Sequence, residues 1–156
     1  MEKDYDASQD PNYIDKFLIG TINFTESINE QEVGNKDTRT NFGKKIGEVK
    51  IEVYGGEGAI PHFHIVGVNS KFQSCVCIHS PNYFAHGGKY KDTLNSKQRE
   101  TLNNWLKESN ILFNTFSNWE TINRIWEGSN PNCKFPDSRK VDIQPDYSKM
   151  EQFKDN

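Results

Sequence analysis

Three of the four histidines and two of the three cysteines lie between residues 60 and 79. The pair His62-x-His64 is followed by the pair Cys75-x-Cys77, and apolar residues alternate with both pairs. Neutral imidazole nitrogens and thiolates are the ligands that zinc prefers in proteins. The residue types therefore make this stretch a candidate metal site.

The alternation predicts a β-hairpin with a two-residue turn at residues 69–70. This register sets His62 opposite Cys77 and His64 opposite Cys75. Directly opposed Cβ atoms lie about 5 Å apart, so the four side chains form a patch on one face of the hairpin. The apolar residues share the other face: Phe63, Ile65, Phe72, Val76 and Ile78. A shift of one residue would mix the two faces.

Interpretations without zinc account for the same patch. Cysteine is a common small, buried strand residue, and two histidines on a half-exposed face can simply form hydrogen bonds. A flat sheet face also brings four ligands together poorly. A disulfide between Cys75 and Cys77 is disfavoured, because residues i and i+2 of a strand lie about 6.5–7 Å apart, at or beyond the distance that a disulfide can bridge. Structural zinc and a sheet face without metal both stay open.

Two further histidines are candidate ligands beside the pair. His79 lies about one dipeptide beyond His62 on the same strand face, whereas His86 lies in a polar loop that would have to fold back. A His-x-His pair on a strand plus a third histidine is a ligand arrangement of catalytic zinc sites. A metal-dependent hydrolase, for example one acting on a phosphodiester, would then use Glu57 or Asp92 as its base.

The loop at 80–92 contains a second group of polar residues, in which Lys89 and Lys91 follow His86 and two glycines. Gly-Gly-Lys invites a phosphate-binding interpretation, but a P-loop needs its full spacing between a strand and a helix. A plain turn with solvated lysines is favoured. The sequence therefore contains no strong nucleotide-binding motif.

Strands and two helices would position these residues. Residues 13–24 and 46–54 predict two strands that precede the hairpin, and Glu52 faces outward from the second. Helices are predicted at about 96–109 and 118–127, each preceded by a capping-box pattern and carrying an apolar stripe. The predicted fold class is α+β: a small antiparallel sheet of three or four strands, built around the hairpin at 60–79, with both helices packed on one face.

The length of 156 residues indicates one domain. Only 33% of the residues are hydrophobic, which indicates a smaller ordered core with polar extensions. We expect a mobile N-terminal tail at 1–12, a single domain at 13–128 with a long polar loop at 25–45, and an extended C-terminal tail at 129–156. Apolar residues of that last tail could dock onto the body or onto a partner.

Composition excludes several classes of protein. The net charge of -3 is not that of a general nucleic-acid binder. No run approaches the 18 or more apolar residues of a membrane span, and the acidic N-terminus does not resemble a signal peptide. Three cysteines are an odd number and do not form a disulfide framework. We expect a cytoplasmic protein with no membrane association.

The arrangement resembles a small prokaryotic domain family of unknown function. The resemblance covers roughly residues 46–126, and its most specific part is Pro61-His62-x-His64, followed by a strand and helices that carry Trp105 and Trp119. Members are often encoded beside a second small protein, as in toxin–antitoxin modules. The chain departs from the family by its N-terminal extension, its enlarged loop after the hairpin and extra residues between the helices. The resemblance implies an α+β fold and a prokaryotic or phage-infected host cell, and it supplies no catalytic residues.

The functional expectation is a non-enzymatic binding or regulatory module that acts on a protein or nucleic-acid partner. Polar tails that could become ordered on binding favour it. The alternatives are the hydrolase that uses His62 and His64 and a scaffold with structural zinc. Because the sequence places both histidines away from the core face, we expect the double substitution His62→Ala and His64→Ala to affect function more than stability.

Overall fold

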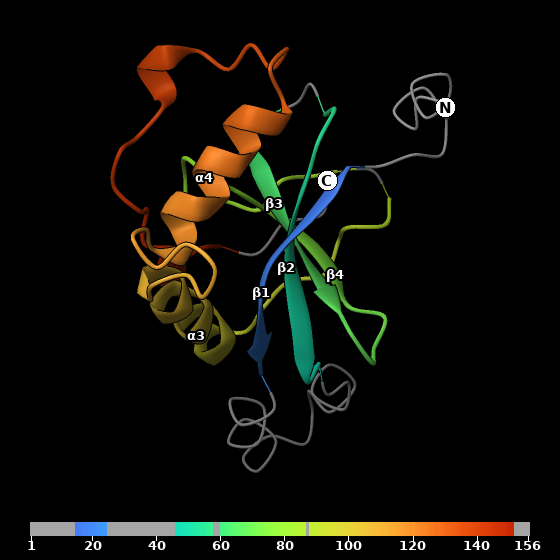
Figure 1. Cartoon of the computed structure of the whole chain (residues 1–156). Helices are drawn as coiled ribbons and strands as arrows, with labels where there is room; N and C mark the ends of the chain where they lie inside the picture. Colours follow the sequence, from blue (N-terminus) through green and yellow to red (C-terminus); the bar gives the residue numbers. More distant parts are fainter. Residues whose placement is uncertain (1–14, 25–45, 58–59, 87, 152–156) are drawn as a thin grey trace, which may run out of the picture.

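The computed structural model of the protein is shown in Figure 1. The residues that it describes are 15–24, 46–57, 60–86 and 88–151. The expected mobile tail at 1–12 and the whole of the expected polar loop at 25–45 lie outside the described residues. Within the described part of the chain, no helix combines the length and the apolar character needed to cross a membrane.

The described strands form one antiparallel sheet in the order β1-β2-β3-β4. Their bounds are Lys16–Asn23, Glu48–Tyr54, His62–Gly67 and Gln73–Cys77. Each strand therefore pairs with its neighbour in sequence, which confirms the expected α+β fold with its central hairpin. The predicted register is also confirmed, since His62 is opposite Cys77 and His64 is opposite Cys75.

Two helices cover one face of this sheet: α3 (Ser96–Lys107) and α4 (Asn118–Ser129) (Figure 1). The capping box that begins α3 is complete. At the start of α4, Ser117 Oγ accepts a hydrogen bond from the Glu120 backbone, but the Glu120 carboxylate pairs with Arg124 instead of reaching back. The apolar residues of both helices and of one sheet face form the core.

The C-terminal segment docks onto the body of the protein. Residues 130–151 are mostly extended, with short 3-10 turns η4 (Asp137–Arg139) and η5 (Tyr147–Lys149). Tyr147 and Met150 are buried in the core, and the Tyr147 hydroxyl donates to the carbonyl oxygen of Cys77 at 2.8 Å. Part of the expected tail at 129–156 thus docks onto the body, one of the two outcomes expected for its apolar residues, whereas Ile143 is 80% exposed.

The second face of the sheet is buried around His62 and His64, although it is exposed along β1, and this corrects the expectation of a half-exposed histidine face. His62 and His64 have no exposed surface, and Glu52, expected to face solvent, is 3% exposed. The loop after β4 folds back over this face: the Phe84 N–H donates to the Cys75 carbonyl at 2.9 Å. Removing both histidines should therefore cost stability as well as function.

Candidate metal centre

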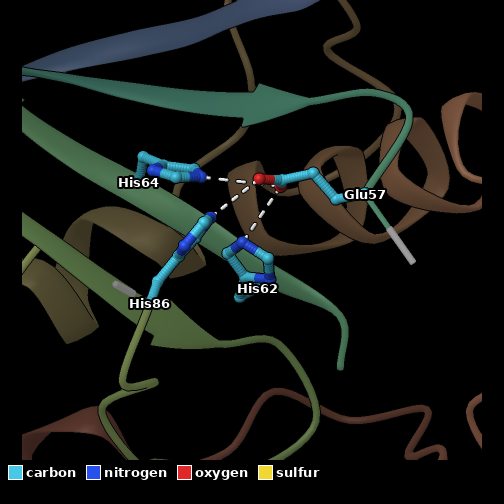
Figure 2. A group of neighbouring side chains, drawn as sticks. All are labelled: Glu57, His62, His64 and His86. Atoms are coloured by element: carbon cyan, nitrogen blue, oxygen red, sulfur yellow. Dashed lines mark hydrogen bonds and ion pairs between the residues drawn. The ribbon is translucent and has the colours of Figure 1, made fainter. Parts of the chain in front are cut away.

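Four side chains converge at one end of the hairpin: Glu57, His62, His64 and His86 (Figure 2). Each offers one potential ligand atom, and all these atoms lie within 4.8 Å of one another. Three imidazoles and one carboxylate form a nitrogen and oxygen donor set that suits transition-metal ions.

Different elements supply the four groups. His62 and His64 point to the same side of β3 because side chains alternate along a strand. Glu57 follows β2, where the chain turns through Gly56, whose φ of 73° is a conformation that glycine adopts without strain. His86 lies in the loop that folds back after β4, in a bridge with Tyr90.

The Glu57 carboxylate lies at the middle of the group. Its Oε1 is 3.0 Å from His62 Nε2 and 3.6 Å from His64 Nε2. Its Oε2 is 2.8 Å from His86 Nε2. Ligand atoms around a tetrahedral zinc ion at ordinary bond lengths lie about 3.3 Å apart. The three distances lie on both sides of that value, so small rotations of the side chains would fit them to an ion.

Two buried atoms of the group lack a hydrogen-bond partner of acceptable geometry: Glu57 Oε1 and His62 Nε2. His62 Nδ1 lies 2.7 Å from the carbonyl oxygen of Ile60, to which only an N–H can donate. That contact leaves the Nε2 lone pair of neutral His62 directed at Glu57. A carbonyl that holds the far nitrogen in this way is a common feature of metal-bound histidines.

Charge and burial set the protonation states. Burial alone would raise the pKa of Glu57, but the imidazoles of His62, His64 and His86 outweigh it and hold that pKa well below its usual range. Burial lowers the pKa of His64. An ionised carboxylate and a neutral imidazole are the forms that bind metal ions.

Aromatic rings enclose the histidines. Tyr54 stacks on His64 with ring centroids 3.9 Å apart, and Phe84 stacks on His62 at 4.5 Å. The indole of Trp126 from α4 lies 5.0 Å from the His62 ring. These contacts fix the ring planes and exclude water from the buried side of the centre.

One side of the centre faces solvent. The side chain of His86 is 33% exposed and that of Glu57 is 19% exposed, whereas the side chains of His62 and His64 are fully buried. Glu57 and His86 are therefore the two of these four side chains that solvent reaches. A catalytic zinc site combines three protein ligands with a water molecule, whereas four protein ligands fill a tetrahedral site. Water would therefore bind here either as a fifth ligand or in the place of the solvent-facing Glu57 carboxylate.

The cysteines do not belong to the group of converging ligand atoms. Cys75 Sγ lies 3.2 Å from His64 Nδ1 and 3.9 Å from His64 Nε2, the nitrogen that faces Glu57. Cys77 is buried, and burial raises the pKa of both thiols. The converging group therefore contains the two histidines of the predicted quartet together with His86 and Glu57, and neither of its cysteines.

The other candidate residues lie elsewhere or have structural contacts. His79 does not join the centre: its Nδ1 accepts a hydrogen bond from the Val141 backbone at 3.0 Å, and its ring stacks on Phe135. Asp92, considered as a base, accepts from the Gln73 backbone at 2.8 Å. Lys89 and Lys91 are exposed.

Sequence reasoning recognised the His-x-His pair and named His86 and Glu57 as alternatives. It did not recognise that Glu57 would lie between all three imidazoles. The only local signal was the turn after β2, which places Glu57 shortly before His62 in sequence.

The sequence matches no family model, and neither a curated protein nor a solved structure matches it. The resemblance to a small prokaryotic domain family therefore stays a prediction. The functional proposal therefore rests on the geometry of these four side chains.

Proposed function

We propose that the protein binds a divalent transition-metal ion through His62, His64, His86 and Glu57 and acts as a metal-dependent hydrolase. The observation that supports this most is the convergence of four ligand atoms within 4.8 Å. Two of the buried atoms among them, Glu57 Oε1 and His62 Nε2, lack hydrogen-bond partners. Burying such groups without compensation is costly, and a bound cation would satisfy both.

Zinc is the ion we favour. Three imidazole nitrogens and a carboxylate suit it, and the contacts of Glu57 match tetrahedral spacing. Iron and other divalent ions accept similar donors, so a test should offer several metals in competition.

Hydrolysis is the chemistry that such a centre supports best. A zinc ion held by the three imidazoles would make a bound water nucleophilic near neutral pH and polarise the bond to be cleaved, provided that Glu57 leaves a position to water or the ion takes a fifth ligand. The protein contributes neutral His64, the ionised Glu57 carboxylate and a dry aromatic wall. Its open side lies between Glu57 and His86, where a substrate would enter.

The first test is the metal content of protein purified under reducing conditions without a metal-binding affinity tag. We expect about one equivalent of zinc in the wild type and none in His64→Ala. His79→Ala is the matched control, because His79 is also a buried histidine but lies outside the centre. Wild-type protein that neither contains metal nor takes it up on titration would overturn the proposal.

A protein-binding regulatory module, in the manner of a two-component pair, is the second candidate. The loop between α3 and α4 favours it, because Ile111 and Leu112 are 89% and 71% exposed. Asn110 holds this loop in shape by accepting hydrogen bonds from the backbones of Leu112 and Phe113. An apolar tip without cations suits a protein partner better than a nucleic acid. Sedimentation of wild type and Leu112→Asp would show whether that partner is a second copy of the chain.

A further inference from the structure

Asn130 connects the end of α4 to the metal centre. It is the residue at which α4 ends, and it is 4% exposed. Its side chain is an amide, with an acceptor oxygen and two donor hydrogens. The oxygen of this amide accepts a hydrogen bond, and its nitrogen donates to other residues of the described chain.

The acceptor side of Asn130 holds Glu57 directly. Its Oδ1 accepts a hydrogen bond from the Glu57 backbone N–H at 2.6 Å. The preceding residue of the helix adds a parallel contact, since the carbonyl oxygen of Ser129 accepts from the Gly56 backbone at 3.1 Å. The turn that presents Glu57 is thus attached to the end of α4 at two successive peptide groups.

The donor side holds the end of the preceding strand and the last turn of the helix. Asn130 Nδ2 donates to the carbonyl oxygen of Tyr54 at 3.0 Å and to that of Trp126 at 3.1 Å. Tyr54 stacks on His64, and Trp126 contacts His62. The side-chain amide of Asn130 therefore contacts both ends of the segment from Tyr54 to Glu57. It also contacts Trp126, which packs on His62.

We propose that Asn130 is a positioning residue that holds the Glu57 carboxylate within reach of the three imidazoles. This inference rests on the proposed metal-binding function of the centre. The turn after β2 contains two glycines and would sample other conformations if it were released. Groups behind metal ligands typically contribute about 10–100-fold to metal affinity when they are removed.

The test compares Asn130→Ala with Asn110→Ala. Asn110 is a matched control, because it is also buried and also organises a loop, with hydrogen bonds to the Ile19 carbonyl and the Asn118 side chain. It has no contact with the centre among the interactions of the described residues. Both variants should lose stability in urea. Only Asn130→Ala should lose zinc affinity, by about 10–100-fold, in competition with a chelator.

Two further measurements separate positioning from general destabilisation. The visible spectrum of bound Co²⁺ should change in Asn130→Ala and stay as in the wild type in Asn110→Ala, because it reports ligand geometry. Asn130→Asp keeps the acceptor for the Glu57 N–H but loses both donors, so it should recover only part of the lost affinity. Equal losses of affinity in both alanine variants, or an unchanged affinity in Asn130→Ala, would overturn the inference.

Failure of the proposed function gives a different result. In that case wild-type protein binds neither Zn²⁺ nor Co²⁺. The metal-free protein then still decides the role of Asn130, through the imidazole resonances of His62 and His86 in NMR spectra. These should move in Asn130→Ala and not in Asn110→Ala if Asn130 holds the Glu57 carboxylate beside them. Resonances that stay in place in both variants would exclude positioning by Asn130.

Discussion

Burial and charge act in opposite directions on Glu57. Desolvation favours its protonated form, whereas the surrounding imidazoles favour the carboxylate, and the imidazoles dominate. The lowered pKa keeps Glu57 ionised at neutral pH. A negative charge at this position balances one charge of a divalent cation, so Glu57 contributes both a ligand atom and electrostatic attraction.

Glu57→Gln tests that role with an almost unchanged shape. We expect zinc affinity to fall by more than about 100-fold. Removing a group that only holds a metal ligand in place costs about 10–100-fold, whereas this substitution removes a ligand and its charge together. Competition with a chelator measures it. Glu127→Gln is the control, because the Glu127 side chain is 49% exposed and pairs with Lys140 outside the centre. If zinc affinity is unchanged and hydrolysis is lost in this variant, Glu57 acts as the catalytic base and not as a metal ligand.

The β3–β4 hairpin is the element whose structure local sequence predicts best. Alternation of apolar and polar residues determined both faces and the register, because a slip of one residue would have buried the wrong set. The same pattern could not show that the second face is covered. That cover depends on contacts between residues distant in sequence, such as Phe84 with His62. Convergence of His86 and Glu57 on the hairpin therefore lay beyond any local pattern.

The returning loop after β4 is attached to the sheet by a reciprocal pair of contacts. Asp92 accepts a hydrogen bond from the Gln73 backbone, and the Asp92 N–H donates to the Gln73 carbonyl at 3.0 Å. The loop closes between β4 and this anchor and carries His86 over the histidine pair. The contacts of Asp92 with Gln73 thus hold the end of the loop that lies beyond His86.

Asp92→Ala should loosen the loop and weaken metal binding by about tenfold, because His86 would spend less time in place. One hydrogen bond of this kind contributes about 1 kcal/mol to stability, so the fold should persist. Chelator competition and urea unfolding measure the two effects. Asp137→Ala is the control, because the Asp137 side chain is 96% exposed. Equal affinities of the two variants would show that other contacts hold the loop.

At the scale of the whole molecule, the proposed metal centre lies beside the hydrophobic core and touches it through Trp126, which packs on His62. The core consists of apolar residues of the other sheet face, both helices and the C-terminal segment, and it includes none of the four proposed ligands. The fold therefore has a source of stability that does not depend on metal. Under the proposed function, chelation should therefore leave the domain folded, whereas removal of a structural zinc ion unfolds its domain.

Metal removal tests this expectation. At a free zinc concentration of about 100 times Kd, binding should stabilise the protein by about 2.7 kcal/mol, which corresponds to about 5–10 °C in Tm for a domain of this size. A chelator should reverse that shift and leave the far-UV circular dichroism spectrum unchanged. Loss of the cooperative transition after chelation would instead favour structural zinc.

The C-terminal segment has a consequence for biosynthesis. Tyr147 and Met150 complete the core, and the Tyr147 hydroxyl donates to carbonyl oxygens at the end of β4. A ribosome makes about 5–20 residues each second, so the sheet and both helices exist for a second or more before their last core residues emerge. During that interval the nascent chain exposes the apolar surface that Tyr147 and Met150 later cover. Truncation by a premature stop codon before Tyr147 would make this exposed state permanent and turn the product into a substrate for chaperones and proteases.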